Sequence, residues 1–337
     1  LSGGETEVLY EFPQAAAPEG IALDRNGNTF VSVRTWDGGA YIANELFKIT
    51  PWGEVSILTD LGPVAPGGSG ILGLTTDPRG NVYATFVSGD SETHGVWKIY
   101  PDGETEHLPG SENIIEPNAL TLDKQGNLYV TDSDTFGQGA TGIWRLGKDT
   151  GVFEPWCGDP LLLEDPANPN GGMPLAAANG IAFDPPNHLY VANTEKSLIA
   201  HVPILKDGSA GQASRVAGGA LVFNPDGLAV DTKGNVYAVI PISTVDLPPA
   251  MGGPLPPLSP VVKVYPQTGL IEPVLNVLSF PDGAYFDFPT SLAFGTGPLD
   301  KKSIFVISMG AENFGFPQGT GPKLTQVGVG VPGQTGQ

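Results

Sequence analysis

Residues 223–239 read FNPDGLAVDTKGNVYAV, and residues 16–32 read AAPEGIALDRNGNTFVS. In both, a small residue and an apolar–Ala–apolar triplet lead into Asp, a Gly-Asn turn and a β-type run. This frame occurs six times, beginning at residues 20, 73, 119, 180, 227 and 291. The sixth copy is degenerate, because Gly295 replaces the Asp and its turn is longer. Self-similarity at this spacing indicates a repeat architecture.

Each copy of the frame is predicted to be a β-hairpin, because a tight turn separates a short strand from a run rich in β-branched and aromatic residues. A third strand with its own turn follows in most copies, as in ELFKITPWGEV (45–55) and GVWKIYPDGET (95–105), and leads to a fourth. Four strands per unit, repeated radially, form a β-propeller blade. We therefore expect an all-β, six-bladed β-propeller.

The two ends of the chain are predicted to meet in the last blade. The run ETEVLYEF (5–12) precedes blade one without a partner, and blade six has no evident fourth strand after KLTQVGVGV (323–331). Pairing of 5–12 in the last blade closes the ring and leaves no large exposed sheet edge. Residues 1–337 are thus expected to form one domain, with blades starting near 18, 71, 117, 178, 225 and 289. The tail after about residue 331 is expected to be disordered or surface-bound.

Composition narrows the class of function. The net charge of −20, from 36 acidic and 16 basic residues, repels phosphate backbones and anionic membranes. Cys157 is the only cysteine, which excludes an intrachain disulfide or a Cys-based zinc site. No apolar run approaches the ~18 residues that span a bilayer. We expect a small-molecule substrate, a monomer or weak oligomer, and a secreted or periplasmic location slightly ahead of a cytoplasmic one.

The frame varies most at the residue that precedes it. In a propeller, equivalent positions of all blades meet around the axis, so these residues are expected at one mouth of the central channel. In blade order they are Glu19, Leu72, Asn118, Asn179, Asp226 and Thr290. Two carboxylates are costly to bury beside two amides unless another group compensates the charge of the carboxylates. An all-oxygen set matches a hard divalent ion, Ca²⁺ first, with Zn²⁺, Mn²⁺ or Mg²⁺ possible; the alternative is that these residues only cap turns.

At these residues the chain resembles the senescence marker protein/gluconolactonase/luciferin-regenerating enzyme family. The resemblance rests on the Pro-Glu-Gly of blade one, Asn179-Gly180 of blade four and PDGLAVD of blade five. It implies a six-bladed propeller that binds one divalent ion and hydrolyses lactones. It also implies that Glu19, Asn179 and Asp226 are metal ligands, with Asn118 at or next to the ion. The chain departs from the pattern in the PNAL context of Asn118.

A lactonase mechanism assigns roles to further residues. The ion would polarise the ester carbonyl and lower the pKa of bound water, and Asp226 is the candidate general base. Candidate substrate-binding residues come from the mouth and from the loops that face it: Arg34, Trp36, Leu72, His94, Asp132, Tyr285, Phe286 and Thr290. The long segments 155–178, 240–260 and 279–289 are expected to lie over the same mouth as a lid.

Two other classes of function fit the same fold. One is a metal-free enzyme similar to strictosidine synthase, in which an acidic residue assists carbon–carbon chemistry. The other is a binding propeller of the NHL-repeat type, which holds a partner without catalysis. A tightly bound ion favours the lactonase, whereas a metal-free channel favours the alternatives, because fold alone does not determine function.

Overall fold

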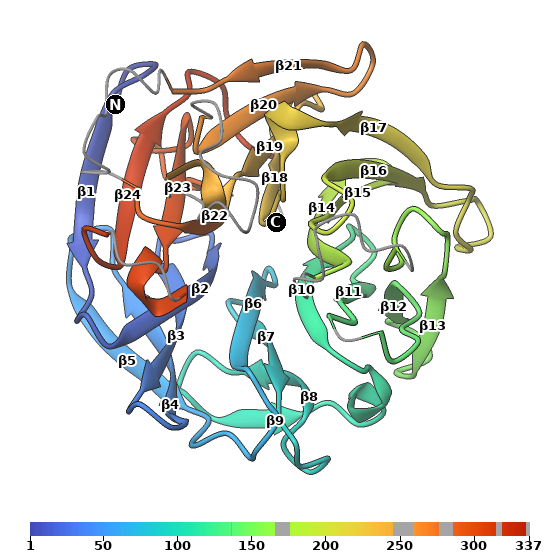
Figure 1. Ribbon diagram of the computed structural model, residues 1–337, viewed down its shortest axis with the longest axis horizontal. Coiled ribbons are helices and arrows are strands. Elements are labelled where there is room, and N and C mark those ends of the chain that lie inside the picture. Colours follow the sequence, from blue (N-terminus) through green and yellow to red (C-terminus); the bar gives the residue numbers. More distant parts are fainter. Residues whose placement is uncertain (136, 166–175, 245–258, 276–285, 315–318, 335–337) are drawn as a thin grey trace, which may run out of the picture.

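The computed structural model describes residues 1–135, 137–165, 176–244, 259–275, 286–314 and 319–334. Within them, the strands form six antiparallel sheets of four strands each, arranged radially around a channel (Figure 1). The predicted all-β, six-bladed propeller is therefore confirmed. Strands β2, β6, β10, β14, β18 and β22 lie nearest the axis, one from each blade.

The strands follow the chain blade by blade. Blades one to three comprise β2 (Ala16–Leu23), β3 (Thr29–Trp36), β4 (Tyr41–Ile49), β5 (Val55–Asp60), β6 (Gly70–Thr76), β7 (Val82–Val87), β8 (Gly95–Ile99), β9 (Thr105–His107), β10 (Pro117–Leu122), β11 (Leu128–Asp132), β12 (Ile143–Leu146) and β13 (Phe153–Cys157). Blades four to six comprise β14 (Ala178–Asp184), β15 (His188–Asn193), β16 (Leu198–Pro203), β17 (Ser214–Gly218), β18 (Leu228–Val230), β19 (Val236–Val239), β20 (Val261–Tyr265), β21 (Leu270–Pro273), β22 (Pro289–Phe294), β23 (Ser303–Ser308), β24 (Lys323–Gly328) and β1 (Thr6–Glu11). The described 3₁₀ helices are η1 (Ser111–Asn113), η2 (Ala220–Val222), η3 (Pro241–Thr244) and η6 (Ala311–Phe314).

The Asp of the repeated frame closes the first hairpin of its blade. The Asp24 carboxylate accepts hydrogen bonds from the backbone N–H groups of Asn26 at 2.8 Å and Asn28 at 2.9 Å, and from the Asn28 amide at 2.7 Å. Gly27 takes the positive φ of 81° that this turn requires. The same network surrounds Asp77, Asp123 and Asp231. The frame therefore specifies the hairpins through local chemistry.

The last blade contains both ends of the chain. Strand β1 pairs antiparallel with β24, with Thr6 opposite Val327 and Glu11 opposite Lys323, and the strand order is β22-β23-β24-β1. In Figure 1 the first strand lies on the outer side of the last sheet. The prediction that 5–12 completes the last blade is confirmed, and the ring is closed by hydrogen bonds between strands.

The apolar core lies between neighbouring blades. One cluster joins Phe30 and Leu46 of blade one to Ile71, Val82 and other residues of blade two, and all of these side chains are buried. Similar clusters fill the other junctions, so each blade is held by sheet-on-sheet packing against the next. This packing fixes the inner strands around the axis.

The C-terminal residues that the structure describes lie near the centre of the ring (Figure 1), where Gln334 lines a small cavity together with Leu23 and Phe294, the last residues of β2 and β22. Gly333 forms an isolated antiparallel bridge with Asp231, and the Gln334 N–H donates to the carbonyl of Val230 at 3.0 Å. The Gln334 amide also donates to Asp184 at 2.9 Å. Residues 332–334 are therefore ordered against the inner strand β18.

No helix in the described ranges has the length and hydropathy needed to cross a membrane.

Candidate functional site

The six mouth residues line one cavity of about 330 Å³. They are Glu19, Leu72, Asn118, Asn179, Asp226 and Thr290, and each comes from a different blade. The structure therefore brings together all four predicted oxygen donors, although they are far apart in the chain. Arg34, predicted to bind substrate, lines the same cavity.

A β-bulge directs the mouth residues toward the axis. The pairing of β2 with β3 shifts between Pro18 and Ile21, so that Glu19 and Gly20 together oppose Ser32. The same shift occurs in the inner strands of blades two, three and four. A bulge bends the strand and re-aims one side chain, which explains why the mouth residue breaks the apolar pattern of the frame.

The glycine after the mouth residue lets neighbouring blades approach closely. A Cβ on Gly20 would overlap the carbonyl oxygen of Leu72, and a Cβ on Gly180 would overlap that of Asp226. Each glycine therefore packs against the backbone of the mouth residue in the following blade. The Glu-Gly and Asn-Gly pairs of the sequence carry both functions: a side chain for the cavity and room for the next blade.

A hydroxyl group fixes the orientation of the Asn179 amide. The Thr194 Oγ1 lies 2.7 Å from the carbonyl oxygen of Pro225, which can only accept, so the hydroxyl donates there. The same oxygen lies 2.9 Å from Nδ2 of Asn179 and accepts from it. Because the hydroxyl proton is already used, the amide must present its NH₂ to Thr194. The Oδ1 of Asn179 is thereby turned away from Thr194.

Asn118 is oriented in the same manner by Ser133. The Ser133 hydroxyl donates to the carbonyl oxygen of Ala178 at 2.7 Å and accepts from Nδ2 of Asn118 at 2.9 Å. Both asparagines line the cavity, and among the described residues their side-chain hydrogen bonds use Nδ2, which leaves Oδ1 as the amide atom that can act as an acceptor or ligand. Two neutral oxygen donors are thus oriented by the protein before any ligand binds.

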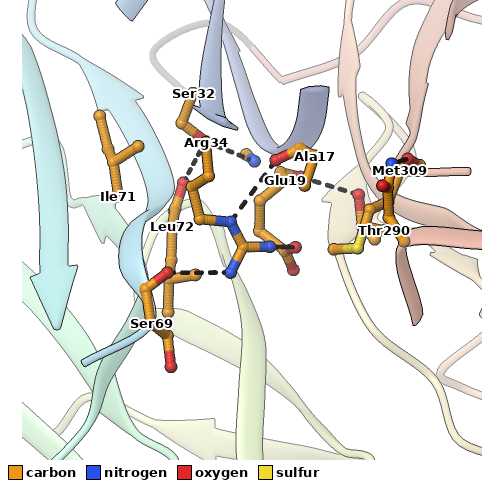
Figure 2. Close-up of polar contacts among 12 residues, drawn as sticks. Ala17, Glu19, Ser32, Arg34, Ser69, Ile71, Leu72, Thr290 and Met309 are labelled. Carbon is orange, nitrogen blue, oxygen red and sulfur yellow. Dashed lines mark hydrogen bonds and ion pairs between the residues drawn. The ribbon is translucent and has the colours of Figure 1, made fainter. Parts of the chain in front are cut away.

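The Glu19 carboxylate is held by Arg34 (Figure 2). The Arg34 Nη2 donates to Oε2 of Glu19 at 2.7 Å, while Nη1 donates to the Ser69 carbonyl at 3.0 Å and Nε points to the Ala17 carbonyl at 3.5 Å. The guanidinium also lies over the ring of Tyr41, 5.0 Å from its centroid. Arg34 is buried and its donors are directed at the protein, so its position suits the support of Glu19 better than the capture of a substrate anion.

Of the carboxylates in the cavity, Glu19 and Asp226 disfavour each other's ionisation. Burial raises the pKa of Glu19, and the positive charge of Arg34 offsets part of this effect. Burial also raises the pKa of Asp226 well above its ordinary value, and the negative charge of Glu19 raises it further. A hydrogen bond from Asn179 and the charge of Arg34 act in the opposite direction. Two carboxylates therefore face one guanidinium, which leaves negative charge uncompensated.

The residues present fit a hard divalent cation. Two carboxylates and two oriented amide oxygens make an all-oxygen donor set, which is the kind that Ca²⁺ prefers. The ion pair with Arg34 uses Oε2 of Glu19, and a carboxylate can bind an ion through its other oxygen. No group of three or more His, Cys, Asp or Glu side chains arranged to hold a metal occurs in the described part of the chain, so the fit depends on the amide oxygens.

His94 does not line the cavity, contrary to its candidate role in substrate binding. The Ser88 N–H donates to Nδ1 of His94 at 3.0 Å, so Nε2 carries the proton and donates to the Ile114 carbonyl at 2.7 Å. The ring is buried between these two loops. His94 therefore braces the second blade.

Asp132 also lies outside the cavity. It is 1% exposed, and its carboxylate accepts hydrogen bonds from the backbone N–H groups of Ile115 and Glu116 and from the Trp144 ring nitrogen. Burial raises the pKa of Asp132, and these donors lower it in part. The carboxylate ties the loop before β10 to its own blade, which is a structural use of the charge.

The aromatic candidates are divided between surface and core. Trp36 is 45% exposed and packs edge-on against Tyr41, with ring centroids 5.1 Å apart. Phe286 is buried in the cluster between blades five and six. Neither lines the cavity, and Tyr285 lies outside the described residues. Of the predicted lid, Ala176, Pro241, Ile242 and Phe288 line the cavity, while 166–175, 245–258 and 276–285 lie outside the described ranges.

Sequence reasoning missed several cavity residues. Those that line the cavity without having been predicted include Tyr41, Glu116, Asn224 and Met309. Glu116 had a usable signal, because it lies two residues before Asn118, and alternate residues of an extended strand share one side. Met309 directly follows β23, in a blade whose frame is degenerate, so comparison with the other repeats does not point to it.

Comparisons with known proteins give the fold. No family model matches the chain, and no curated protein matches its sequence. A luciferin-regenerating enzyme matches with a TM-score of 0.64 at 15% identity, covering 98% of each chain. A gluconolactonase from Xanthomonas campestris matches with a TM-score of 0.60 at 17% identity, covering 98% of this chain and 89% of that one. A calcium-binding regucalcin from Agrobacterium tumefaciens matches with a TM-score of 0.62 at 14% identity, covering 97% of this chain and 94% of that one.

These solved structures are six-bladed propellers of the senescence marker protein/gluconolactonase/luciferin-regenerating enzyme family. The chain shares their fold over nearly its whole length. At identities of 14–17% the likeness is one of fold, so the chemistry of this chain has to be argued from its own cavity.

Proposed function

We propose that this protein is a lactonase-type hydrolase that opens a cyclic or related ester, with a divalent cation held by Glu19, Asn118, Asn179 and Asp226. The observation that carries the proposal is the convergence of two carboxylates and two oriented amides on one cavity. The shared fold with a gluconolactonase and with a calcium-binding regucalcin supports it. Ca²⁺ is the favoured ion because every donor is oxygen.

Asp226 is the proposed general base. Burial and the charge of Glu19 raise its pKa in the ion-free cavity, and a bound cation would oppose that rise and keep the carboxylate ionised, as a general base must be. When bound, the cation would polarise the ester carbonyl and lower the pKa of a bound water. Asp226 accepts the proton of the attacking water as the new C–O bond forms. The ester C–O bond breaks, the proton passes to the leaving alkoxide, and the product is a hydroxy acid.

The other residues prepare the cavity. Arg34 fixes Glu19 and removes part of its charge, so that Asp226 is ionised more readily than it would be beside an unpaired carboxylate. Ser133 and Thr194 orient the two amides. Apolar side chains on the cavity wall, Leu72 and Ile242 among them, limit the access of bulk water to the reacting ester.

Calorimetric titration of chelator-treated protein with Ca²⁺, Mg²⁺, Mn²⁺ and Zn²⁺, paired with a lactone panel, tests the proposal. The Asp226→Asn variant keeps an oxygen donor but loses a charge and the base, so it should abolish hydrolysis while only weakening ion binding. Asp132→Asn is the matched control, since Asp132 is a buried carboxylate outside the cavity. If no ion binds wild type better than it binds the Glu19→Gln/Asp226→Asn double variant, the proposal fails. A metal-free enzyme or a binding propeller would then be the better interpretation.

A further inference from the structure

We propose that Glu116 selects ester substrates that also carry an ammonium or hydroxyl group, and that the cavity rejects anionic esters. The inference rests on the proposed hydrolase function and names its substrate class. It starts from the charges in the cavity. Four of the described residues that line it are charged: Glu19, Arg34, Glu116 and Asp226.

These four charges form two separate poles. Arg34 is paired with Glu19 at 2.7 Å, and the charge of Glu19 also acts on Asp226. A bound divalent cation would therefore make this pole positive. The single positive charge of Arg34 and the double charge of the cation together exceed the two negative charges of Glu19 and Asp226. The Glu116 carboxylate is instead hydrogen-bonded by the Thr135 N–H of blade three. Glu116 is therefore the one described cavity carboxylate whose negative charge is not balanced by Arg34 or by the cation.

Glu116 is fixed in place on the cavity wall. Its Oε2 accepts a hydrogen bond from the backbone N–H of Thr135 at 2.6 Å, and its own backbone N–H donates to Asp132 at 2.9 Å. Thr135 also lines the cavity. The carboxylate is half-buried, and burying a charge costs free energy unless the charge is paired. A donor or cation from a ligand would offset that cost.

The polarity of the cavity defines the ligand. An ester whose carbonyl oxygen faces the Glu19–Asp226 pole can present a hydroxyl or ammonium group to Glu116, where it forms a charge-assisted hydrogen bond. Its hydrocarbon part would contact the apolar wall that Leu72, Phe288 and Met309 contribute. A carboxylate or phosphate at the same position would meet a fixed like charge, which is an effective device for excluding the wrong substrate.

The competing interpretation is that Glu116 only braces the loop at Thr135. Glu116→Gln separates the two, because the Gln side-chain oxygen can still accept the Thr135 N–H while the charge is lost. Glu195→Gln is the matched control. The Glu195 carboxylate likewise accepts a backbone N–H, from Asp165 at 2.7 Å, but Glu195 does not line the cavity.

The test compares three lactones of one ring size: α-amino-γ-butyrolactone, unsubstituted γ-butyrolactone and a γ-butyrolactone carboxylate. In wild type, kcat/KM should be highest for the amino compound and lowest for the carboxylate. Glu116→Gln should reduce the ratio of amino to unsubstituted substrate about tenfold, in keeping with the loss of one hydrogen bond to a charged group. Glu116→Lys should reverse the order, and Glu195→Gln should keep the wild-type ratio. An unchanged ratio in Glu116→Gln overturns the proposal.

A binding experiment separates failure of this inference from failure of the proposed function. If no lactone is hydrolysed, the hydrolase proposal falls, and calorimetry with 3-amino-2-pyrrolidinone and 2-pyrrolidinone still examines Glu116. Wild type should bind the amino compound about tenfold more tightly, and Glu116→Gln should lose that preference. Equal affinity of wild type for the two compounds, or binding of neither, overturns the inference.

Discussion

Replacement of Thr194 by Val tests whether the Asn179 amide is oriented as the structure indicates. Valine has nearly the same shape as threonine but lacks the hydroxyl that donates to Pro225 and accepts from Asn179. The buried carbonyl and amide would each lose a partner, at a cost of about 1–3 kcal/mol per group. We therefore expect a loss of at least about 2 kcal/mol in the free energy of unfolding.

The same substitution should also weaken ion binding. Without its hydroxyl partner, the Asn179 amide is no longer held with its oxygen available to a ligand. Loss of an outer partner of this kind typically costs about 10–100-fold in metal affinity. Calorimetric titration of chelator-treated protein with Ca²⁺ measures the change, and urea unfolding of the same samples measures stability. Thr194→Ser, which retains the hydroxyl, should keep the wild-type affinity.

The matched control is Thr85→Val. The Thr85 hydroxyl also bridges two blades, since it accepts from the Gly73 N–H at 2.9 Å and donates to the Asn118 carbonyl. It contacts backbone groups in both bonds, so its loss should lower stability to a similar extent while the Ca²⁺ affinity stays within a factor of about two. Equal losses of affinity in Thr85→Val and Thr194→Val, or none in Thr194→Val, would refute the reasoning about the amide.

Three further outcomes follow from the structure. Folding raises the pKa of Asp226 and Glu19. Above about pH 4 the folded protein therefore binds more protons than the unfolded chain. Ion-free wild type should consequently lose stability as the pH rises from 4 to 8. Asp226→Asn should flatten that slope in urea unfolding with chelator, and parallel slopes would contradict the account. Gly180→Ala should cost more than about 3 kcal/mol in thermal unfolding, since the new Cβ overlaps the next blade; a near-wild-type melting temperature would show that the blades can separate. Deletion of residues 1–11 should expose the edge of β24 and cause concentration-dependent association in size-exclusion chromatography, reversed by a peptide of residues 5–12.

The fold was predictable because its determinants are local and repeated. The Asp24 turn network lies within five consecutive residues, and the same residue types recur in three other blades. Once the ring is inferred, symmetry alone places the mouth residues together, and so Glu19 and Asp226 could be linked across about 200 positions of sequence. The strand within 5–12 has no partner in blade one, and the last blade lacked a fourth strand, so the two could be paired from the sequence.

The loop side chains were not predictable from the same reasoning. His94 and Asp132 follow second strands, on the side of the mouth, yet their rings and oxygens satisfy buried backbone groups of neighbouring loops. Which partner a loop side chain finds depends on contacts that the repeat does not encode. Glu116 shows the converse, because it lines the cavity from a position just outside the frame.

The meeting of β1 and β24 in one sheet has a consequence for the synthesis of the protein. Strand β1 leaves the ribosome before the other strands of its sheet, because its partner β24 lies more than 300 residues later. At about 5–20 residues per second, the first strand waits on the order of 15–60 s for that partner. During this interval it is an unpaired edge next to a half-built ring. A chain that terminates before β24 never forms the last sheet, so the ring cannot close until β24 has been synthesised, and a product truncated before β24 is left open to proteolysis.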